Sequence, residues 1–512
     1  MPERIKCYII NSFSRLLYKN EYKKFLKIKD LKKQQSKKLL EILTKNKVCA
    51  YGKKFNFHKI KNITAYQNLV PLTTYEDYLP FIEKIKNGEQ NILTSEAVLI
   101  LEPTGGSTSA IKLIPYTKSL QIEFQKGLKP WLYDLYTQNR ELNWGKSYWS
   151  ITPATMQKKY TKGGLPIGFE EDSDYLGGWG NRLLKHIMAV SAKVAQEKNI
   201  AAFYDKTALS LLKCKNLTFI SIWNPTLLIL ILDHIEKNSA RLLSELPPQR
   251  RSKVKKFLQD KTYHKLWPHL KVISCWSDAQ AHLYAEKLKK LFPHVYLQPK
   301  GLLATEGFIS LPFTNEKGAR LSINSHFFEF ISTRDNKIYL AHELAKGEEY
   351  EVVITTSGGF YRYKLNDLIK VVGFQGVFPL IKFRGKRDKV CDLFGEKLHE
   401  NFLKNTMDHL GVKDSFYMFA PEQNGYVLYL QAEQIPPNLD EALRENFHYD
   451  YCRKLGQLQA VKIFKLTGDP LREYIYECVQ RGQKLGDIKP TVLHLESGWD
   501  KVFKGNYIVE GD

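Results

Sequence analysis

The sequence predicts an α/β protein: a large N-terminal multi-layer α/β domain with a β-hairpin subdomain, followed by a smaller C-terminal α+β domain. Two observations lead to this fold class. Helical stretches alternate with short runs of β-branched and apolar residues over most of the chain, which favours α/β layers. After Gly385–Asp388 the pattern changes to a separate α+β series. We therefore expect two domains, at residues 1–387 and 388–512.

Recognisable starts and stops define the elements of the N-terminal part. Residues 1–62 are predicted to be helical with Gly52 as a stop, and Thr73 or Thr74 is expected to cap the next helix. Proline suits the first turn of a helix, so a core helix should begin near Pro225. The other elements expected in this part are a helix at 115–140 and strands at 96–101, 217–223, 272–275, 295–297, 351–355 and 368–372.

Turn residues mark the hairpin subdomain. Gly358-Gly359 separates two short strands, and Leu365-Asn366-Asp367 is predicted to turn into the next strand. In the C-terminal domain we expect helices at 396–410 and 439–446 and strands at 425–431 and 460–465.

Composition indicates a globular protein with a basic N-terminal region. Among 512 residues, 43% are apolar and 12% aromatic, which argues against disorder. The net charge is +23, and residues 1–62 contain 18 Lys or Arg against 4 Asp or Glu. Such a stripe could contact nucleic acid or anionic lipid. Because lysine predominates and no nucleic-acid motif accompanies it, a solvated helical face is the favoured interpretation and we expect no nucleic-acid partner.

Cysteine usage and hydropathy point to the cytoplasm. The seven cysteines are scattered without a Cys-x-x-Cys pair, so neither a zinc site nor a disulfide framework is indicated. The N-terminus has too short an apolar run for a signal peptide. The most apolar stretch, 217–235, contains Asn224-Pro225 and Asp233, so no stable membrane insertion is expected.

The loop from Glu102 to Lys112 has the composition of a polyphosphate cradle. Its glycines let backbone N–H groups converge, and its Ser and Thr hydroxyls add donors beside the positive charge of Lys112. The order of a Walker A loop is absent, and loops of this composition are more often plain surface turns.

Two later segments carry groups that suit the rest of a nucleotide. Thr305 and Glu306 follow a predicted strand between Gly301 and Gly307, and a carboxylate there could hold Mg²⁺ together with substrate phosphates. Asp367 could accept both hydroxyls of a ribose. In isolation, the Thr305–Glu306 segment is better explained as a helix cap or surface turn, and Asp367 could belong to an ordinary hairpin turn. Each segment alone is ambiguous, but the ordered trio is not.

Taken in order, the three segments resemble the nucleotide motifs of the adenylate-forming superfamily. The closer resemblance is to the Gretchen Hagen family of acyl acid amido synthetases, which is known for plant auxin and jasmonate conjugation and is present in bacteria. Residues 361–374 nearly reproduce the characteristic Y-R-Y-x-L-G-D-V-V-K-V-x-G-F of that family. Residues 266–277 also look like its L-W-P-x-L-K-V-x-S-C-W segment. We expect a bacterial-type member.

The resemblance implies ATP and Mg²⁺ as cofactors. Ser107 and Thr108, with backbone N–H groups around Gly106, would hold the ATP phosphates. Thr305 and Glu306 would lie beside the α-phosphate, with Glu306 also near Mg²⁺. The ribose hydroxyls would be bound by Asp367. Several residues depart from the family pattern: Ser109, Ile111, Leu302, Asn366 and Lys386. Asn366 stands where glycine is usual, and asparagine also tolerates left-handed backbone.

The resemblance further implies that residues 1–387 form an adenylation domain and residues 388–512 a mobile lid, with a hinge near Lys386–Asp388. Two lysines of the lid are candidates for approaching the nucleotide. Lys397 ends a segment similar to the post-hinge D-x-D-K, and Lys489 lies in one similar to the late Q-Y-K-T-P. The alternative for either lysine is a solvated surface residue.

The implied activity is that of an acid–amino acid ligase, a monomer whose partners are small molecules. A carboxylic acid would be converted with ATP to an acyl-adenylate and pyrophosphate, and an amine, expected to be an amino acid, would then take the acyl group. Two alternatives remain open: an adenylate-forming ligase that transfers to a thiol such as CoA, and an inactive basic binding protein of the same fold.

Overall fold

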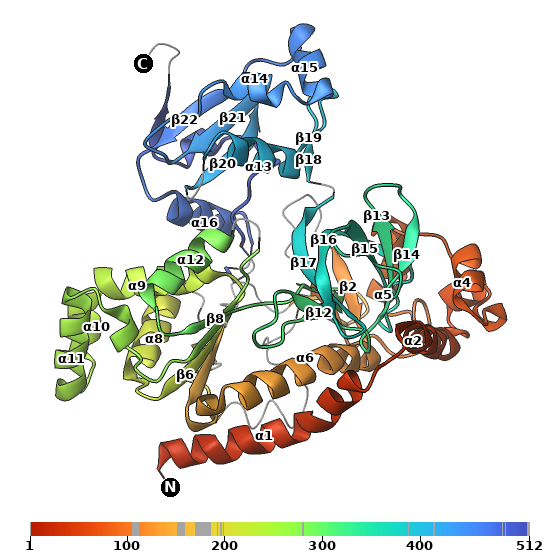
Figure 1. The fold of residues 1–512 in the computed structure, drawn as a ribbon, viewed down its shortest axis with the longest axis horizontal. Helices are drawn as coiled ribbons and strands as arrows, with labels where there is room; N and C mark the ends of the chain where they lie inside the picture. Colours follow the sequence, from red (N-terminus) through yellow and green to blue (C-terminus); the bar gives the residue numbers. More distant parts are fainter. Residues whose placement is uncertain are drawn as a thin grey trace. The chain divides into compact units, whose positions relative to one another are not determined.

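The computed structural model describes residues 2–104, 112–150, 159–168, 186–191, 193–194, 197, 199–278, 281–387, 389–412, 415–483, 485–486 and 488–508. The chain divides into two compact units, each described here by itself (Figure 1). The first unit comprises residues 1–278 and 287–384, and the second comprises 279–286 and 385–512.

A parallel four-stranded sheet forms one layer of the first unit, in the order β3-β6-β7-β8. All five residues of β6 are buried, as expected for a strand covered on both faces. The strand and helix predicted around Pro225 are confirmed: Asn224 caps α9 by accepting from the Thr226 N–H, and Pro225 occupies the first turn. The elements of this layer are β3 (Lys146–Trp149), β6 (Leu217–Ser221), β7 (Val272–Cys275), β8 (Tyr296–Pro299), α8 (Ile200–Lys213), α9 (Pro225–Lys237), α10 (Ser239–Ser244) and α11 (Pro248–Gln259). Helix α12 (Ala281–Leu291) is divided, with residues 281–286 in the second unit and 287–291 in the first.

A seven-stranded sheet forms the hairpin subdomain, in the order β11-β12-β17-β16-β15-β13-β14. Its longest strand corrects one expectation: Leu365–Asp367 does not turn between strands. These residues bulge within a single strand, β16, because Glu351 pairs with Leu368 whereas Val353 pairs with Lys364. The strands are β11 (Ser310–Leu311), β12 (Ala319–Leu321), β13 (Phe327–Ser332), β14 (Ile338–Leu340), β15 (Glu349–Thr355), β16 (Tyr363–Gln375) and β17 (Phe378–Lys386).

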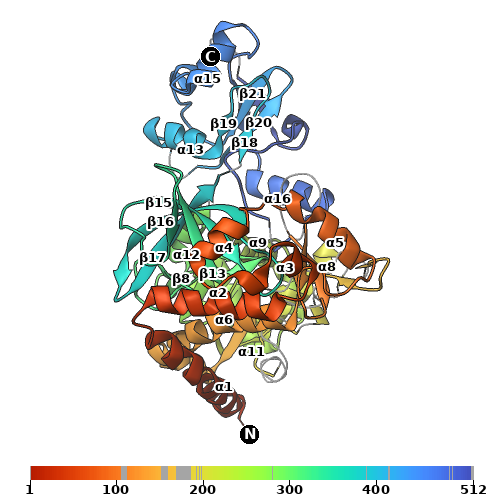
Figure 2. The same ribbon diagram turned by 90° about the vertical axis from the view of Figure 1, so that its right-hand side faces the viewer.

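Long N-terminal helices cover the first unit, and α1 packs along α6 (Figure 2). Two predicted boundaries were wrong. Gly52 lies inside the short helix α3 rather than ending a helix, and the helix expected near Thr73 or Thr74 begins at Leu79, after a 3-10 turn. The helices are α1 (Glu3–Leu26), α2 (Leu31–Asn46), α3 (Ala50–Lys54), α4 (Ile63–Leu69), α5 (Leu79–Lys86) and α6 (Lys118–Gln138).

Two small sheets complete the first unit. One has the order β2-β1-β5-β4, and the other is the hairpin of β9 and β10. Their strands are β1 (Ile100–Pro103), β2 (Leu113–Tyr116), β4 (Lys159–Tyr160), β5 (Pro166–Ile167), β9 (Leu303–Ala304) and β10 (Gly307–Phe308).

The second unit is a smaller α+β structure built on a sheet in the order β20-β21-β22-β23. The sheet and its helices enclose a separate apolar core that includes Leu403, Leu428 and Tyr449. The predicted fold class is thus confirmed. The elements are β18 (Val390–Cys391), β19 (Leu398–His399), β20 (Tyr417–Glu422), β21 (Gly425–Leu430), β22 (Lys462–Leu466), β23 (Gly505–Tyr507), α13 (Glu400–His409), α14 (Leu439–Leu443), α15 (Phe447–Lys454) and α16 (Pro470–Gln480).

Candidate active site

The candidate phosphate loop is the connection between two antiparallel strands. Pro103 of β1 pairs with Leu113 of β2, and the Thr104 N–H donates to the Lys112 carbonyl at 2.9 Å. These bonds fix both ends of the loop. The predicted phosphate ligands Gly106, Ser107 and Thr108, together with the departures Ser109 and Ile111, lie outside the described residues.

Tyr75 contacts the residues that follow this loop, Lys112 and Leu113. Its hydroxyl accepts from the Leu113 N–H at 2.7 Å, and the Lys112 ammonium lies 5.6 Å from the centre of its ring. Burial raises the pKa of Tyr75, and nearby carboxylates, including that of Glu306, raise this pKa further. The end of the loop is therefore held within electrostatic reach of the second predicted segment.

Thr305 and Glu306 form the two-residue turn of the β9–β10 hairpin. Ala304 pairs with Gly307 on either side of the turn. From β2, the Tyr116 hydroxyl donates to the Thr305 carbonyl at 2.5 Å. The strand that leaves the phosphate loop thus also holds the turn.

The third segment reaches the same turn through Tyr363. The Tyr363 hydroxyl of β16 donates to Oε1 of Glu306 at 3.3 Å. Burial raises the pKa of Tyr363, and the charge of Glu306 raises it further, which keeps the hydroxyl protonated as a donor.

Asp367 lies four residues further along β16 and is buried, with 4% exposure. It follows Asn366, whose φ of 60° confirms the left-handed backbone expected there. The bulge gives Asp367 a local backbone direction that a regular strand would not. Hydrogen bonds therefore join the turn to β2, the strand that follows the candidate phosphate loop, through Tyr116, and to β16 through Tyr363.

A buried ionic cluster supports the turn from its β10 side. The Phe308 N–H donates to Nε2 of His326 at 2.9 Å, and Nδ1 of His326 lies 3.1 Å from the Glu123 carboxylate. Since Nε2 accepts, the ring proton is on Nδ1 and the imidazole is neutral. Glu123 also binds the Lys38 ammonium at 2.5 Å and accepts from the Ser357 hydroxyl at 2.6 Å.

Burial and charge agree with this assignment of protons. Burial lowers the pKa of His326 against the opposing attraction of Glu123. The Lys38 charge and the hydrogen bonds outweigh burial at Glu123, whose pKa is lowered to about 2. Gly307 is required beside this cluster, because a Cβ there would come within 2.9 Å of the His326 ring.

The two residues that precede Tyr363 in its motif have structural contacts. Tyr361 is fully buried, and its ring stacks on Tyr51 with centroids 4.9 Å apart. Arg362 forms a buried fork with the Glu329 carboxylate, both bonds being 3.0 Å long, and donates to the Val70 carbonyl at 2.8 Å. The motif therefore fixes β16 in the core on one side and reaches Glu306 on the other.

Lys397 belongs to the second unit, at the end of the loop that joins β18 to β19. It is exposed, with a left-handed φ of 46°. Beside it, Glu396 is fully buried and accepts from the N–H groups of Leu393 and Phe394, both at 2.8 Å. The loop is thus anchored through Glu396, while the Lys397 side chain points away from the core.

Lys489, also in the second unit, is exposed on a segment tied to α13. Its carbonyl accepts from the Tyr474 hydroxyl at 3.2 Å. Two residues on, the Thr491 hydroxyl donates to Glu400 at 2.5 Å. The same Glu400 oxygen accepts from the Lys389 ammonium at 2.9 Å. Both predicted lysines therefore lie in the second unit, whereas the turn lies in the first.

Sequence reasoning missed the residues that hold the turn and its β10 side: Tyr116, Tyr363, His326 and Glu123. Tyr363 lies in the motif on which the resemblance rests, so the motif could have been used to identify it as a site residue. No local signal pairs Tyr116 with Thr305, since 189 residues separate them.

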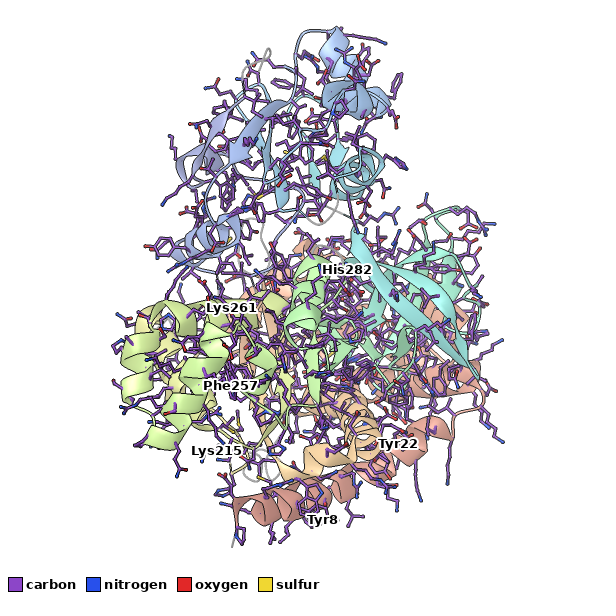
Figure 3. The ribbon with its side chains drawn as sticks, turned by 60° about the vertical axis from the view of Figure 1, so that its left-hand side comes forward. Tyr8, Tyr22, Lys215, Phe257, Lys261 and His282 are labelled. Carbon is purple, nitrogen blue, oxygen red and sulfur yellow. The ribbon has the colours of Figure 1, made fainter. Side chains whose placement is uncertain are left out.

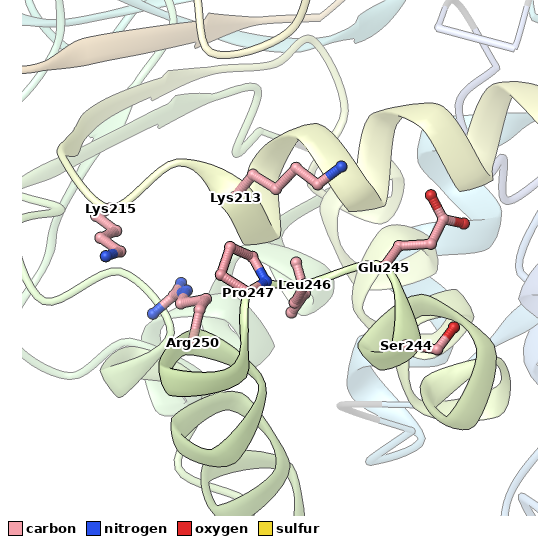
Figure 4. Close-up of a pocket in the computed structure, with 7 residues that line it drawn as sticks. All are labelled: Lys213, Lys215, Ser244, Glu245, Leu246, Pro247 and Arg250. Atoms are coloured by element: carbon pink, nitrogen blue, oxygen red, sulfur yellow. The ribbon is translucent and has the colours of Figure 1, made fainter.

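Other features of the described residues contribute no part of this site. A surface pocket of about 490 Å³ between α8, α10 and α11 is lined by none of the predicted site residues (Figure 4). Among the residues described, no cluster of three or more His, Cys, Asp or Glu could hold a metal ion. In the same part of the chain, no helix combines the length and apolar character that crossing a membrane requires.

Comparison with known proteins identifies the family. The model of the GH3 family N-terminal domain matches residues 22–253, and that of the GH3 family central domain matches residues 319–386. Jasmonoyl-L-amino acid synthetase JAR4 of Nicotiana attenuata is 24% identical over 428 residues, which cover 73% of each chain. Indole-3-acetic acid-amido synthetase GH3.2 of Arabidopsis thaliana is 23% identical over 462 residues, covering 78% of this chain and 82% of that protein.

A solved structure shows the same fold. The structure entitled "AtGH3.15 acyl acid amido synthetase in complex with 2,4-DB" aligns with a TM-score of 0.80 and 18% sequence identity. The alignment covers 98% of this chain and 96% of that one. With this shared fold, and with two family domain models that together match more than half of its residues, the chain belongs to the GH3 family.

Proposed function

We propose that this protein is an ATP-dependent acyl acid amido synthetase that adenylates a carboxylic acid and transfers the acyl group to an amine, expected to be an amino acid. One observation carries the proposal. The Thr305–Glu306 turn is hydrogen-bonded to the strand leaving the candidate phosphate loop and to the strand carrying Asp367. The relatives named as amido synthetases support the same activity.

Each segment has one role in binding ATP. The hydroxyls of Ser107 and Thr108 and the backbone around Gly106 hold the phosphates. Thr305 and Glu306 lie beside the α-phosphate. Asp367 accepts the ribose hydroxyls. Tyr116 and Tyr363 keep the Thr305–Glu306 turn oriented before ATP arrives, which reduces the reorganisation needed at the transition state.

The Glu306 carboxylate is suited to bind Mg²⁺. Mg²⁺ in nucleotide enzymes is commonly bound by one or two carboxylates together with substrate phosphates, so a dedicated protein cage is not needed. Bound Mg²⁺ supplies neutralisation of phosphate charge. The Tyr363 hydroxyl orients the Glu306 carboxylate by donating to Oε1.

Two displacement steps complete the reaction. A carboxylate oxygen of the acid attacks the α-phosphorus, and pyrophosphate leaves with the electrons of the broken P–O bond. The amine nitrogen then attacks the acyl carbonyl; AMP leaves and the nitrogen loses a proton. Residues 1–387 form the adenylation domain and residues 388–512 the lid. Lys397 or Lys489 stabilises the developing phosphate charge.

No covalent enzyme intermediate is required. All seven cysteines are buried, and burial raises the pKa of Cys275 to about 12, so this thiol remains protonated. Free buried thiols are usual in reducing compartments, which supports a cytoplasmic location.

Carboxylic-acid-dependent exchange of pyrophosphate into ATP tests the adenylation step. A panel of carboxylic acids is screened first, and amines are then screened with the best acid. Exchange with an amide product supports the proposal. A thioester formed only with CoA would instead support the thiol-transferring alternative. If the protein binds no ATP and shows no exchange with any acid, the result would support the alternative of an inactive binding protein.

Substitutions connect the activity to the site. Glu306→Gln and Asp367→Ala should each slow exchange by at least about tenfold, since each removes a charged ligand. Glu433→Gln and Asp408→Ala are matched controls at exposed positions of the second unit and should leave exchange unchanged. Full exchange in both site variants contradicts the assignment.

A further inference from the structure

Helix α1 presents an apolar face to solvent. Its exposed large side chains have between 40% and 61% of their surface accessible. They recur at helical spacing along the first turns of α1, so they form one stripe. This outward apolar face consists of Ile5, Tyr8, Ile9, Phe13, Leu16 and Leu17. Monomeric soluble proteins rarely leave a contiguous apolar surface of this kind uncovered.

The opposite side of α1 faces the protein and is mixed in character, with Cys7, Asn11, Ser14, Tyr18 and Phe25 buried. Asn11 is buried and its amide donates to three carbonyls, those of Leu142, Asn143 and Gly145. Ser14 is also buried. An ordinary surface helix buries its apolar stripe and exposes its polar one. Helix α1 buries a mixed stripe and leaves a second, apolar stripe exposed.

Specific contacts hold α1 in this orientation. Near its start, Glu3 pairs with Lys146 at 2.6 Å, and near its end Phe25 stacks on Phe378 with centroids 4.6 Å apart. Turning the helix over would break these contacts and the bonds of Asn11. Figures 1 and 2 show α1 at the edge of the first unit with α6 on its inner side. The outward apolar face is therefore a fixed feature of the surface.

Positive charge and aromatic rings accompany the outward apolar face. Helix α1 carries six Lys or Arg and two Glu, and Lys19, Lys23 and Lys24 extend the exposed side beyond Leu17. Tyr8, labelled in Figure 3, stacks on the exposed ring of Trp144 with centroids 4.2 Å apart. Amphipathic helices that lie in a membrane interface combine an apolar stripe, flanking lysines and interfacial aromatic residues.

We propose that the outward apolar face of α1 docks this protein on the surface of an anionic lipid bilayer. The helix lies parallel to the surface, with Ile9, Phe13 and Leu16 entering the boundary between headgroups and acyl chains. Its lysines contact the lipid phosphates, with their stems lying along the apolar stripe. This interaction is peripheral and independent of the proposed enzymatic reaction. It also replaces the sequence-based interpretation of the N-terminal lysines as merely solvated.

Charge argues against a second copy of this chain as the occupant. Two copies meeting through this face would bring their α1 lysines together, and each chain carries a net charge of +23. An anionic surface is complementary to the same lysines. The outward apolar face lies outside residues 22–253, which match the model of the family's N-terminal domain.

Vesicle flotation with the full-length protein tests the proposal. Vesicles of phosphatidylglycerol and phosphatidylcholine in equal amounts are compared with pure phosphatidylcholine, at low and high salt. Wild-type protein should float with the anionic vesicles and be released by salt. Phe13→Glu with Leu16→Glu should weaken binding at least about tenfold, because two charges would enter the apolar boundary.

Matched variants separate the contributions of charge and apolar surface. Lys19→Glu with Lys23→Glu should also weaken binding at least about tenfold, whereas Lys253→Glu with Lys256→Glu, which makes the same charge change on exposed positions of α11, should have a small effect. Val48→Glu, at a residue 54% exposed after α2, controls for loss of apolar surface elsewhere. Thermal melting of every variant checks that it folds.

Three results would overturn the proposal. The first is wild-type protein that does not float with anionic vesicles at low salt. The second is binding that survives both α1 double substitutions. The third is a dimer, seen by light scattering, that Phe13→Glu with Leu16→Glu dissociates, since this would make the face an interface between two copies.

Discussion

The turn Thr305–Glu306 and the two lid lysines differ in how their positions are fixed. The turn is held by Tyr116 on one side and Tyr363 on the other, with a buried ionic cluster against β10. Lys397 and Lys489 are exposed, and the segments that carry them are anchored through buried Glu396 and largely buried Glu400.

This difference indicates two ways of building a site. Groups that meet a nucleotide in one defined pose benefit from a rigid surrounding that sets their geometry in advance. An exposed lysine on a separate unit instead suits a group that acts in only part of a reaction cycle. Changes around the turn should therefore alter stability and activity together, whereas changes of the lysines should alter activity alone.

The largest effect is expected for Arg362→Leu. The Arg362 and Glu329 side chains are only 5% and 1% exposed, so the substitution leaves a buried carboxylate without its main partner. The free energy of unfolding should fall by about 3–5 kcal/mol in urea titrations. Arg334→Leu is the control, because the Arg334 side chain is 65% exposed beside Glu348 and should cost less than about 1 kcal/mol. Equal losses would show that the buried pair is not part of the framework.

Next in size is Tyr116→Phe, which removes only the hydroxyl that donates to Thr305. We expect exchange to slow by about tenfold, the equivalent of one hydrogen bond of about 1–1.5 kcal/mol. Tyr339→Phe removes an exposed hydroxyl that donates to Asp335 at 3.0 Å and should leave exchange unchanged. If Tyr116→Phe exchanges pyrophosphate at the wild-type rate, the hydrogen bond from β2 to the turn does not contribute to activity.

A smaller effect concerns pH, and it compares one buried histidine from each unit. Burial lowers the pKa of His326 from 6.5, a shift that Glu123 opposes and the charges of Lys38 and Lys126 reinforce. Burial lowers the pKa of His494 to about 4. Below pH 6.5 the unfolded chain takes up protons that these folded imidazoles do not. Stability is therefore retained above that pH and declines as pH falls toward the folded pKa.

Unfolding titrations from pH 7 downward measure this decline. His326→Gln should reduce the dependence of the first unit by up to about 1.4 kcal/mol per pH unit, the value for one proton. His494→Gln should do the same for the second unit. An unchanged slope in His326→Gln would mean that the imidazole is protonated in the folded protein and does not accept from Phe308.

The smallest effect on stability is expected for the lid lysines. Lys397→Ala and Lys489→Ala should change the free energy of unfolding by no more than about 0.5 kcal/mol, because both side chains are exposed. At least one of them should nevertheless slow amide formation. Lys454→Ala, at a lysine 68% exposed beside Asp450, is the matched control and should change neither quantity. If Lys397→Ala and Lys489→Ala both form the amide at the wild-type rate, neither lysine takes part in catalysis.

The sequence predicted elements that depend on local patterns. The helix beginning at Pro225 has its cap and its proline adjacent in the chain, and strand β7 occupies the predicted residues 272–275. The turn expected at Leu365–Asp367 was wrong because a bulge is defined by pairing with β15, which local residues do not show. The left-handed backbone predicted at Asn366 was confirmed, but the residue lies in a bulge of β16 and not in a turn between strands.

The candidate site was predictable to a similar degree. Motif order suggested that the loop, the turn and Asp367 belong together. The groups that connect them could not be inferred, because Tyr116 and His326 act through contacts with residues distant in the chain. The orientation of α1 was equally hidden, since a helical pattern does not say which face meets the protein.

A double-substitution cycle tests most directly whether the Thr305–Glu306 turn is part of the site that binds and activates ATP. Acid-dependent pyrophosphate exchange is measured for Tyr363→Phe, Glu306→Gln and the two combined. If Tyr363 acts by orienting Glu306, each single change slows exchange, and the combination is no slower than Glu306→Gln alone. Losses that multiply in the combined variant would contradict this, because the two residues would then act independently.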